Sequence, residues 1–312
     1  MENLILTFNI ILPVFLMMVI GYISKQIGLV TEETISGMNK LVFRLFLPAS
    51  LCQSVMKADM DSMSNPLVLA FGFLGTFVVF LISMLIIPRI EPQNPRRGVM
   101  IQGIFRSNYA ILGIPLIEAL FPEGDGGVAA MMVIAAVPLF NVLAVITLET
   151  FRGGHPSLRK ILSGIVRNPL IWGCVIGFVL MQLRVTLPPF AASTLSKLAS
   201  ASSPLALFTL GGSINLHAIR HNARSLAISV SGKLLITPLA MLSIAYLCGF
   251  RGAEFAVLML VFGAPSAVNS FTMAAQMDGD AELAAQQVML STVLCSATLF
   301  VMIFLFKTVG IF

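Results

Sequence analysis

Uninterrupted apolar segments of about 20 residues recur along this chain, and they constrain its fold more than any other feature. The stretch from Val68 to Ile87, for example, contains no charged residue. A helix needs about 20 such residues to cross the hydrocarbon core of a bilayer. Only 11% of the 312 residues are charged, against roughly 25% in soluble domains, which leaves too few polar groups to cover a soluble surface. The chain is therefore predicted to be an all-α polytopic membrane protein.

Hydropathy over windows of about 19 residues identifies ten transmembrane segments. They lie at residues 3–24, 34–56, 66–88, 98–119, 126–150, 165–183, 194–214, 225–247, 252–277 and 281–306. Ten Lys and Arg residues fall in the odd-numbered loops and five on the opposite side. Because basic loops stay in the cytoplasm, both termini of this multi-pass protein of the cell (plasma or inner) membrane are predicted to be extracytoplasmic.

An internal repeat divides the chain into two halves. Three residues recur 156 positions later, namely Pro13, Gly21 and Pro48 as Pro169, Gly177 and Pro204. We predict a first five-helix repeat at residues 1–150, a cytoplasmic linker at 151–164 and a second repeat at 165–312. Because five is odd, the second copy must enter the membrane from the opposite side, which is the inverted repeat of secondary transporters.

The fourth segment of each half is interrupted by small, polar and helix-breaking residues. Aligning Phe105 with Phe262 places residues 106–108 opposite residues 263–265. Irregular backbone at membrane depth is tolerated only against protein or a water-filled cavity, and a helix that restarts there directs its N–H groups at the centre. A kink without a function is the alternative for either segment alone. The paired breaks predict an anion site, with substrate-binding candidates Arg106, Ser107, Asn108, Tyr109, Pro265, Ser266, Asn269 and Ser270.

Charged and amide side chains inside the predicted spans are further candidates. Arg106 has a planar fork that suits a carboxylate, although it could instead reach the cytoplasmic face. Lys233 lies deep in the eighth segment, where it could neutralise a substrate or replace a coupling cation. Arg44 either compensates charge or extends to the interface. Asn141 is predicted to line the cavity, since a neutral amide can bind a carboxylate without a buried charge. Gln286 and Gln287 are interpreted as polarity at the cytoplasmic end of the last segment.

Other chemistries are not indicated by the sequence. The three histidines have no metal-ligand spacing, and the four cysteines are isolated within apolar segments. A phosphate-binding glycine loop is absent. The net charge of +5 reflects scarce acidic residues rather than a basic patch. We therefore predict no enzyme activity, no metal, no cofactor and no nucleic-acid partner.

Several motifs resemble the auxin efflux carrier family over nearly the whole chain. They are Asn39–Phe43 leading to Leu47–Leu51, Ser107–Tyr109, Lys233–Pro238 and Gly263–Pro265. The resemblance implies a fold similar to the bile-acid sodium symporters, with crossed broken helices, an elevator-type transport domain and a homodimer. In the plant carriers an asparagine matching Asn108 holds the auxin carboxylate, but Arg106 departs from their pattern. Bacterial relatives are similar to malate and malonate permeases.

Together these features predict a secondary transporter, for efflux or uptake of small organic anions such as mono- or dicarboxylates, by alternating access in the lipid bilayer. A sodium-coupled symporter is one alternative. It is disfavoured because residues 264–276 contain no acidic residue, whereas the symporters carry a glutamate in the matching helix. A membrane sensor that binds the anion without moving it is an alternative of another class.

Overall fold

The computed structural model describes residues 2–56, 66–121, 126–152 and 158–312, and within these ranges all regular structure is helical. The helices in order are α1 (Glu2–Gln26), α2 (Glu32–Leu41), η1 (Val42–Phe46), α3 (Leu47–Met56), α4 (Pro66–Ile90), α5 (Asn94–Phe105), α6 (Tyr109–Leu120), α7 (Gly126–Thr150), α8 (Leu158–Arg167), α9 (Pro169–Gln182), α10 (Pro189–Ser213), η3 (His217–Ile219), α11 (Ala223–Ser231), η4 (Gly232–Ile236), α12 (Thr237–Leu247), α13 (Gly252–Gly263), α14 (Asn269–Gln276) and α15 (Ala281–Thr308). The all-α prediction is confirmed for the described residues.

Four helices are long and apolar enough to cross a membrane by length and composition. They are Pro66–Ile90, Gly127–Thr150, Ala223–Leu247 and Ala281–Thr308, and the pair Ile161–Arg167 and Pro169–Gln182, bent by 59°, counts as a fifth only if the two helices form one span. The fourth segment of each half is divided into two helices of at most 12 residues, too short to span alone. The chain is thus a multi-pass membrane protein, and its ten crossings stay a prediction.

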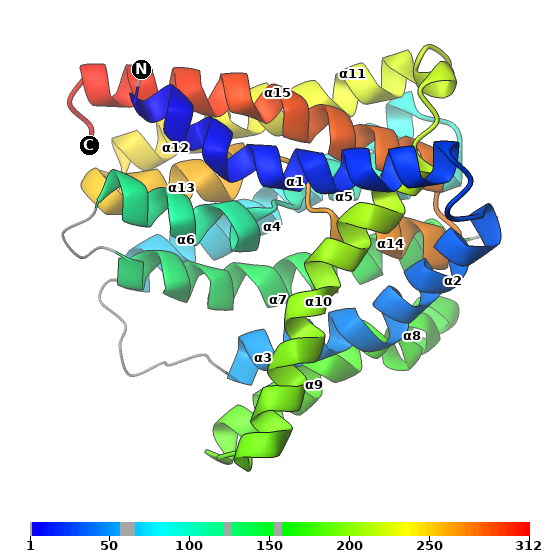
Figure 1. Ribbon diagram of the computed structural model, residues 1–312. Helices are drawn as coiled ribbons and strands as arrows, with labels where there is room; N and C mark the ends of the chain where they lie inside the picture. Colours follow the sequence, from blue (N-terminus) through cyan, green and yellow to red (C-terminus); the bar gives the residue numbers. More distant parts are fainter. Residues whose placement is uncertain (1, 57–65, 122–125, 153–157) are drawn as a thin grey trace.

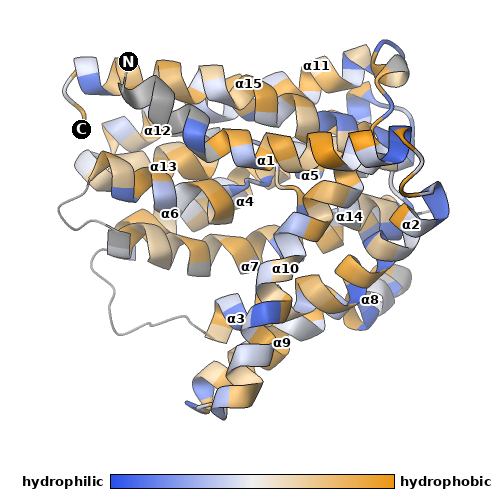
Figure 2. Cartoon of the chain, viewed as in Figure 1, coloured by the Kyte–Doolittle hydropathy of each residue, from blue (hydrophilic) through white to orange (hydrophobic). Residues whose placement is uncertain are grey.

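Two groups of helices make up the molecule. In the first group, α3 packs along α9, α1 packs along α10, and α10 also contacts α3. In the second, α4 packs on α5, α12 on α13 and α14 on α15, with α7 against both groups. Figure 1 shows the first group projecting at the lower edge through α9 and α10, and it places both termini at the left-hand end. Figure 2 shows hydrophilic residues gathered at the right-hand end, around the start of α2 and along α8.

Two glycines set the close approach of helices in the first group. A Cβ added to Gly21 would lie 2.1 Å from the carbonyl oxygen of Phe208, and one added to Gly177 would lie 2.6 Å from that of Cys52. Small residues of this kind let membrane helices pack backbone to backbone. Gly21 and Gly177 are 156 residues apart, and so are Cys52 and Phe208. The same contact is therefore made twice, with the two halves exchanging roles.

The predicted linker at 151–164 ends within a helix. Residues 153–157, including His155, lie outside the described residues, and α8 begins at Leu158. Its sequence alternates basic and apolar side chains at helical spacing, which is typical of a helix lying at a membrane surface. Asn168 then separates α8 from α9, because its side-chain oxygen accepts a hydrogen bond from Leu170 N and caps the new helix.

Candidate functional site

Two helix breaks face each other at the centre of the second group. The first comprises residues 106–108 between α5 and α6, and the second comprises residues 264–268 between α13 and α14. Both occur where the sequence predicts an interruption. All of residues 101–109 and 255–268 are buried, so irregular backbone here is enclosed by protein, as its depth requires.

Hydrogen bonds join the two breaks directly. The Asn108 N–H donates to the Pro265 carbonyl oxygen at 2.8 Å. The Ser266 hydroxyl donates to the Gly103 carbonyl oxygen at 2.8 Å. The Ser107 hydroxyl donates to the Leu260 carbonyl oxygen at 3.3 Å. Each break therefore supplies a serine that satisfies a carbonyl group of the opposite helix, and the residue that precedes α6, Asn108, is bonded to the second break.

Arg106 is the charged group within the first break. Its side chain is 2% exposed. One guanidinium nitrogen donates to Asn141 Oδ1 on α7 at 2.6 Å, and another contacts Met273 Sδ on α14 at 2.8 Å. Both partners are neutral, and no carboxylate pairs with Arg106 among the described residues. Burying a charge is costly unless an opposite charge is supplied, and none of the described residues supplies one to this guanidinium.

Lys233 supplies a second buried cation from the eighth segment. It lies in the π-helical turn η4 and is fully buried, and its Nζ has no hydrogen-bond partner in the described residues. The turn η4 packs against α13 and α15, and the Cys295 thiol of α15 donates to the Gly263 carbonyl oxygen at 3.6 Å. Lys233 therefore comes from a turn that packs against the helix leading into the second break. Such π-helical turns occur frequently at functional sites.

Further amide donors near the breaks lack acceptors. Asn108 Nδ2 and Gln287 Nε2 are both buried without a partner in the part of the chain that the structure describes. A Cβ added to Gly103 would lie 1.7 Å from Gln287 Nε2, so this amide lies against the helix that leads into the first break. Gln286 and Gln287 are 0% and 1% exposed. Gln286 belongs to a polar cluster near the start of α15, where it accepts from Asn222 Nδ2 at 2.8 Å and donates to the Asn215 carbonyl oxygen at 3.0 Å, in keeping with its interpretation as polarity at a helix end. Gln287 differs, because its amide faces the helix that leads into the first break, and no local sequence pattern indicates that contact.

The other predicted residues have different environments. Tyr109 is buried, and its hydroxyl donates to the Ala129 carbonyl oxygen on α7 at 3.1 Å. Ser270 is buried with an unpartnered hydroxyl, and its carbonyl accepts from Gln102 Nε2 at 3.0 Å. Asn269 begins α14 and is partly exposed. Arg44 lies in the π-helical turn η1, exposed, in a cavity with three other arginines rather than at the breaks.

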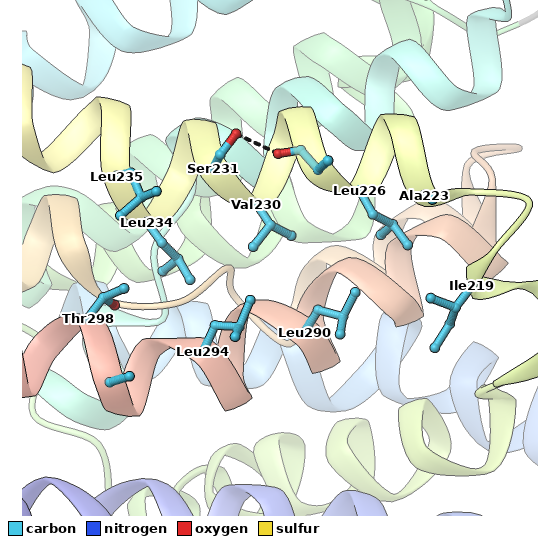
Figure 3. Close-up of a pocket in the computed structure, with 12 residues that line it drawn as sticks. Ile219, Ala223, Leu226, Val230, Ser231, Leu234, Leu235, Leu290, Leu294 and Thr298 are labelled. Carbon is cyan, nitrogen blue, oxygen red and sulfur yellow. Dashed lines mark hydrogen bonds between the residues drawn. The ribbon is translucent and has the colours of Figure 1, made fainter.

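Several cavities lie outside the breaks, and two of them are close to the second group of helices. One of about 230 Å³ reaches Phe271 and Gln276 of α14 from the side of α1 and α2. The other, of about 510 Å³, lies between α11–η4 and α15 (Figure 3). The second has an apolar lining apart from Ser231, whose hydroxyl donates to the Ala227 carbonyl, and Thr298. It offers no charge to an anion. Among the described residues, no group of His, Cys, Asp and Glu is arranged to hold a metal ion.

Helix breaks that face each other inside a multi-pass membrane protein, with buried basic groups nearby, are typical of transporters. The chain belongs to the membrane transport protein family, whose model matches residues 6–154 and 154–303. The resemblance to auxin efflux carriers is thus confirmed at the level of the family.

Relatives agree with this assignment. A protein of Methanothermobacter thermautotrophicus named as an uncharacterized transporter is 26% identical over 93% of this chain and 95% of its own length. The uncharacterized transporter YfdV of Escherichia coli K12 is 24% identical over 87% of this chain and 89% of its own. A protein of Rhizobium meliloti with the provisional name malonate transporter is 22% identical over 96% of each chain. The family is one of transport proteins, not of enzymes.

Proposed function

We propose that this protein is a secondary transporter of small organic anions, and that mono- or dicarboxylates bind between the two helix breaks. The observation that carries the proposal is the buried guanidinium of Arg106, which meets only an amide oxygen and a thioether sulphur. Unpartnered donors at Asn108, Lys233 and Gln287 add to the excess of positive and donor groups. A carboxylate would satisfy these groups, and the provisional name of the Rhizobium relative fits such a substrate.

The binding geometry follows from the elements around the breaks. Asn108 and Arg106 come from the first break, while Pro265, Ser266, Asn269 and Ser270 come from the second and from the start of α14. Asn141 holds the guanidinium through its oxygen and is itself fixed by donating to the Val137 carbonyl oxygen at 2.7 Å. The N-terminal ends of α6 and α14 add partial positive charge. Lys233 balances charge from the side of α13.

We propose ten membrane crossings in two inverted repeats, with both termini extracytoplasmic. The reciprocal contacts of Gly21 with Phe208 and of Gly177 with Cys52 support a two-fold relation between the halves. The family match also divides at residue 154, within the predicted linker. The first helical group would act as the scaffold and dimer contact. The second group would carry the anion by elevator-type movement.

The substrate assignment is tested with purified protein and a panel of malate, malonate and indole-acetate. Thermal-shift measurements report binding, and uptake into proteoliposomes reports transport. Asn108→Ala should lower both binding and uptake, whereas the matched control Asn9→Ala, an exposed asparagine on α1, should leave them unchanged. Unchanged affinity and uptake in the Asn108→Ala variant would contradict the site.

Two further measurements separate the alternatives. Because the basic groups of Arg106 and Lys233 are already buried at or near the breaks, we expect uptake to be independent of sodium. Uptake that stops when choline replaces sodium would indicate a symporter. Counterflow of labelled anion distinguishes a carrier from a sensor, because a sensor binds the anion without exchanging it across the bilayer.

A further inference from the structure

A second cationic site lies on the outer surface of the molecule, away from the breaks. It is a cavity of about 950 Å³ lined by four arginines, Arg44, Arg152, Arg159 and Arg167, and one carboxylate, Glu149. Arg152 pairs with Glu149 at 3.2 Å and with Asp278 at 2.7 Å. Arg44, Arg159 and Arg167 have no ion pair within the described ranges. The cavity therefore presents uncompensated positive charge.

Helix α8 forms one wall of this cavity. Arg159, Ser163 and Arg167 recur every four residues, so they lie on one face of the helix, and all three line the cavity. Gly164 brings this wall close to Glu149, since an added Cβ would lie 2.2 Å from the carboxylate. Leu162 and Val166 are each 61% exposed. A helix with this division of basic and apolar faces lies in the plane of the membrane interface.

The corner between α8 and α9 is also typical of a membrane interface. Trp172, in the first turns of α9, is 53% exposed, and its indole N–H donates to the Val166 carbonyl oxygen at 2.8 Å. Tryptophan is enriched at the level of lipid headgroups. Beyond it, exposed apolar side chains continue along α9, at Val175, Ile176, Phe178 and Val179. The basic cavity therefore opens where polar headgroups meet acyl chains.

We propose that this cavity binds the phosphate headgroup of an anionic glycerophospholipid from the predicted cytoplasmic leaflet. Arginine suits phosphate because its fork donates two parallel hydrogen bonds. Basic pockets at the cytoplasmic ends of membrane helices are suited to such headgroups. Pro169, which lines the cavity, is also the first residue of α9. A lipid with its phosphate in the cavity can therefore place its acyl chains along the apolar face of α9. A soluble anion has no acyl chains to make this contact.

The test uses Trp172, the single tryptophan of the chain. The protein is reconstituted into phosphatidylcholine vesicles that contain a fixed fraction of dibrominated lipid, which quenches a tryptophan in contact with it. Brominated phosphatidylglycerol should quench Trp172 more strongly than brominated phosphatidylcholine at the same mole fraction. Equal quenching by the two lipids would overturn the proposal.

Variants assign the preference to the cavity. Each basic residue near an anionic membrane surface contributes about a five-fold preference, so Arg159→Gln with Arg167→Gln should reduce the preference by at least about five-fold. The matched control is Arg220→Gln with Arg224→Gln, which removes two exposed arginines near the start of α11 and should keep the preference. A preference that survives in the Arg159/Arg167 variant would contradict the assignment.

A soluble competitor separates a lipid from a free anion. Excess glycerol phosphate or malonate should leave the preference of Trp172 for phosphatidylglycerol unchanged, because the acyl chains on α9 add to the affinity of the lipid. Loss of the preference in either solution would show that the cavity takes a free anion instead. Both variants are compared with the unmodified protein for thermal stability, so that a folding defect is not taken for lost binding.

Discussion

The two helix breaks each interrupt the fourth segment of one half, and they differ in chemistry. The first break carries a guanidinium and an amide of its own, in Arg106 and Asn108. The second break, residues 264–268, has no charged or amide side chain, and its nearby charge comes from Lys233 on η4. Each break nevertheless donates a serine hydroxyl to the helix that leads into the other break. The acceptors are Gly103 and Leu260, which are matched positions in the alignment of Phe105 with Phe262.

This difference assigns two roles, holding the crossing together and binding the anion, to different groups of residues. The two serine bonds fix the geometry of the crossing, and they need only hydroxyl groups and carbonyl oxygens. The basic groups are proposed to determine what is bound. Arg106 lies in the first break and Lys233 lies on η4, so they do not occupy equivalent positions. The comparison predicts that changes in charge alter anion binding, whereas changes in packing and serine bonds alter stability.

The largest expected effect is at Arg106. Arg106→Gln removes the buried positive charge, and a lost hydrogen bond to a charged group costs about 1.5–3 kcal/mol, so the Kd for malonate should rise roughly 10- to 100-fold. Arg106→Lys should give an intermediate Kd, because it keeps the charge and loses the fork. The control Arg89→Gln changes an exposed arginine. A Kd for Arg106→Gln within two-fold of that of the unmodified protein would show that the first break does not bind the anion through its charge.

Lys233 tests the charge beside the second break. Lys233→Met keeps the length of the side chain and removes a buried group without a partner, so the apo protein should melt at a higher temperature. The same variant should bind malonate roughly ten-fold more weakly, through loss of about 1.4 kcal/mol. Thermal melting with and without malonate measures both effects. Lys40→Met, at an exposed lysine, is the control, and a fall in melting temperature for Lys233→Met would contradict this account.

The glycines before the two breaks should differ in their tolerance of a methyl group. A Cβ at Gly103 would lie 1.7 Å from Gln287 Nε2, whereas at Gly263 the nearest atom is Met302 Sδ at 3.2 Å. Gly103→Ala should therefore cost about 1–3 kcal/mol through overpacking, and Gly263→Ala should cost much less. Thermal unfolding in detergent compares the two. Equal melting temperatures for the variants would show that Gln287 moves aside without cost.

The smallest expected effect distinguishes the two serine bonds. Ser266→Ala removes a bond of 2.8 Å and Ser107→Ala one of 3.3 Å. A typical hydrogen bond contributes about 1 kcal/mol, so Ser266→Ala should lower the melting temperature more than Ser107→Ala. Ser200→Ala, at an exposed serine on α10, serves as the reference. A larger loss for Ser107→Ala would reverse the order of the two bonds.

The positions of the breaks could be predicted from the sequence because local chemistry determines them. Glycine, proline and short polar residues within an apolar segment disfavour a continuous helix, and the helices end at Phe105 and Gly263. The alignment of Phe105 with Phe262 pairs Asn108 with Pro265, and in the structure the Asn108 N–H donates to the Pro265 carbonyl oxygen.

Other features depend on tertiary structure or on patterns that hydropathy averages away. The contact of Gln287 with Gly103 joins residues far apart in the chain, so no local pattern reports it. Hydropathy windows do not identify helix α8, because the mean hydropathy of an amphipathic segment is close to that of a loop. The π-helical turns at η1 and η4 change the hydrogen-bond spacing without changing the apolar pattern, so the burial of Lys233 was predicted but its backbone setting was not.

The backbone bond between Asn108 and Pro265 has a mechanical consequence. In the proposed two-fold relation of the breaks, a reciprocal bond would run from residue 265 to the Asn108 carbonyl oxygen. Proline has no N–H to donate, and that oxygen instead accepts from Ile111 and Leu112 of α6. One backbone bond, worth about 1 kcal/mol, therefore joins Asn108 to Pro265. Any rearrangement of the crossing must break the side-chain bonds of Ser266 and Ser107 as well as this one.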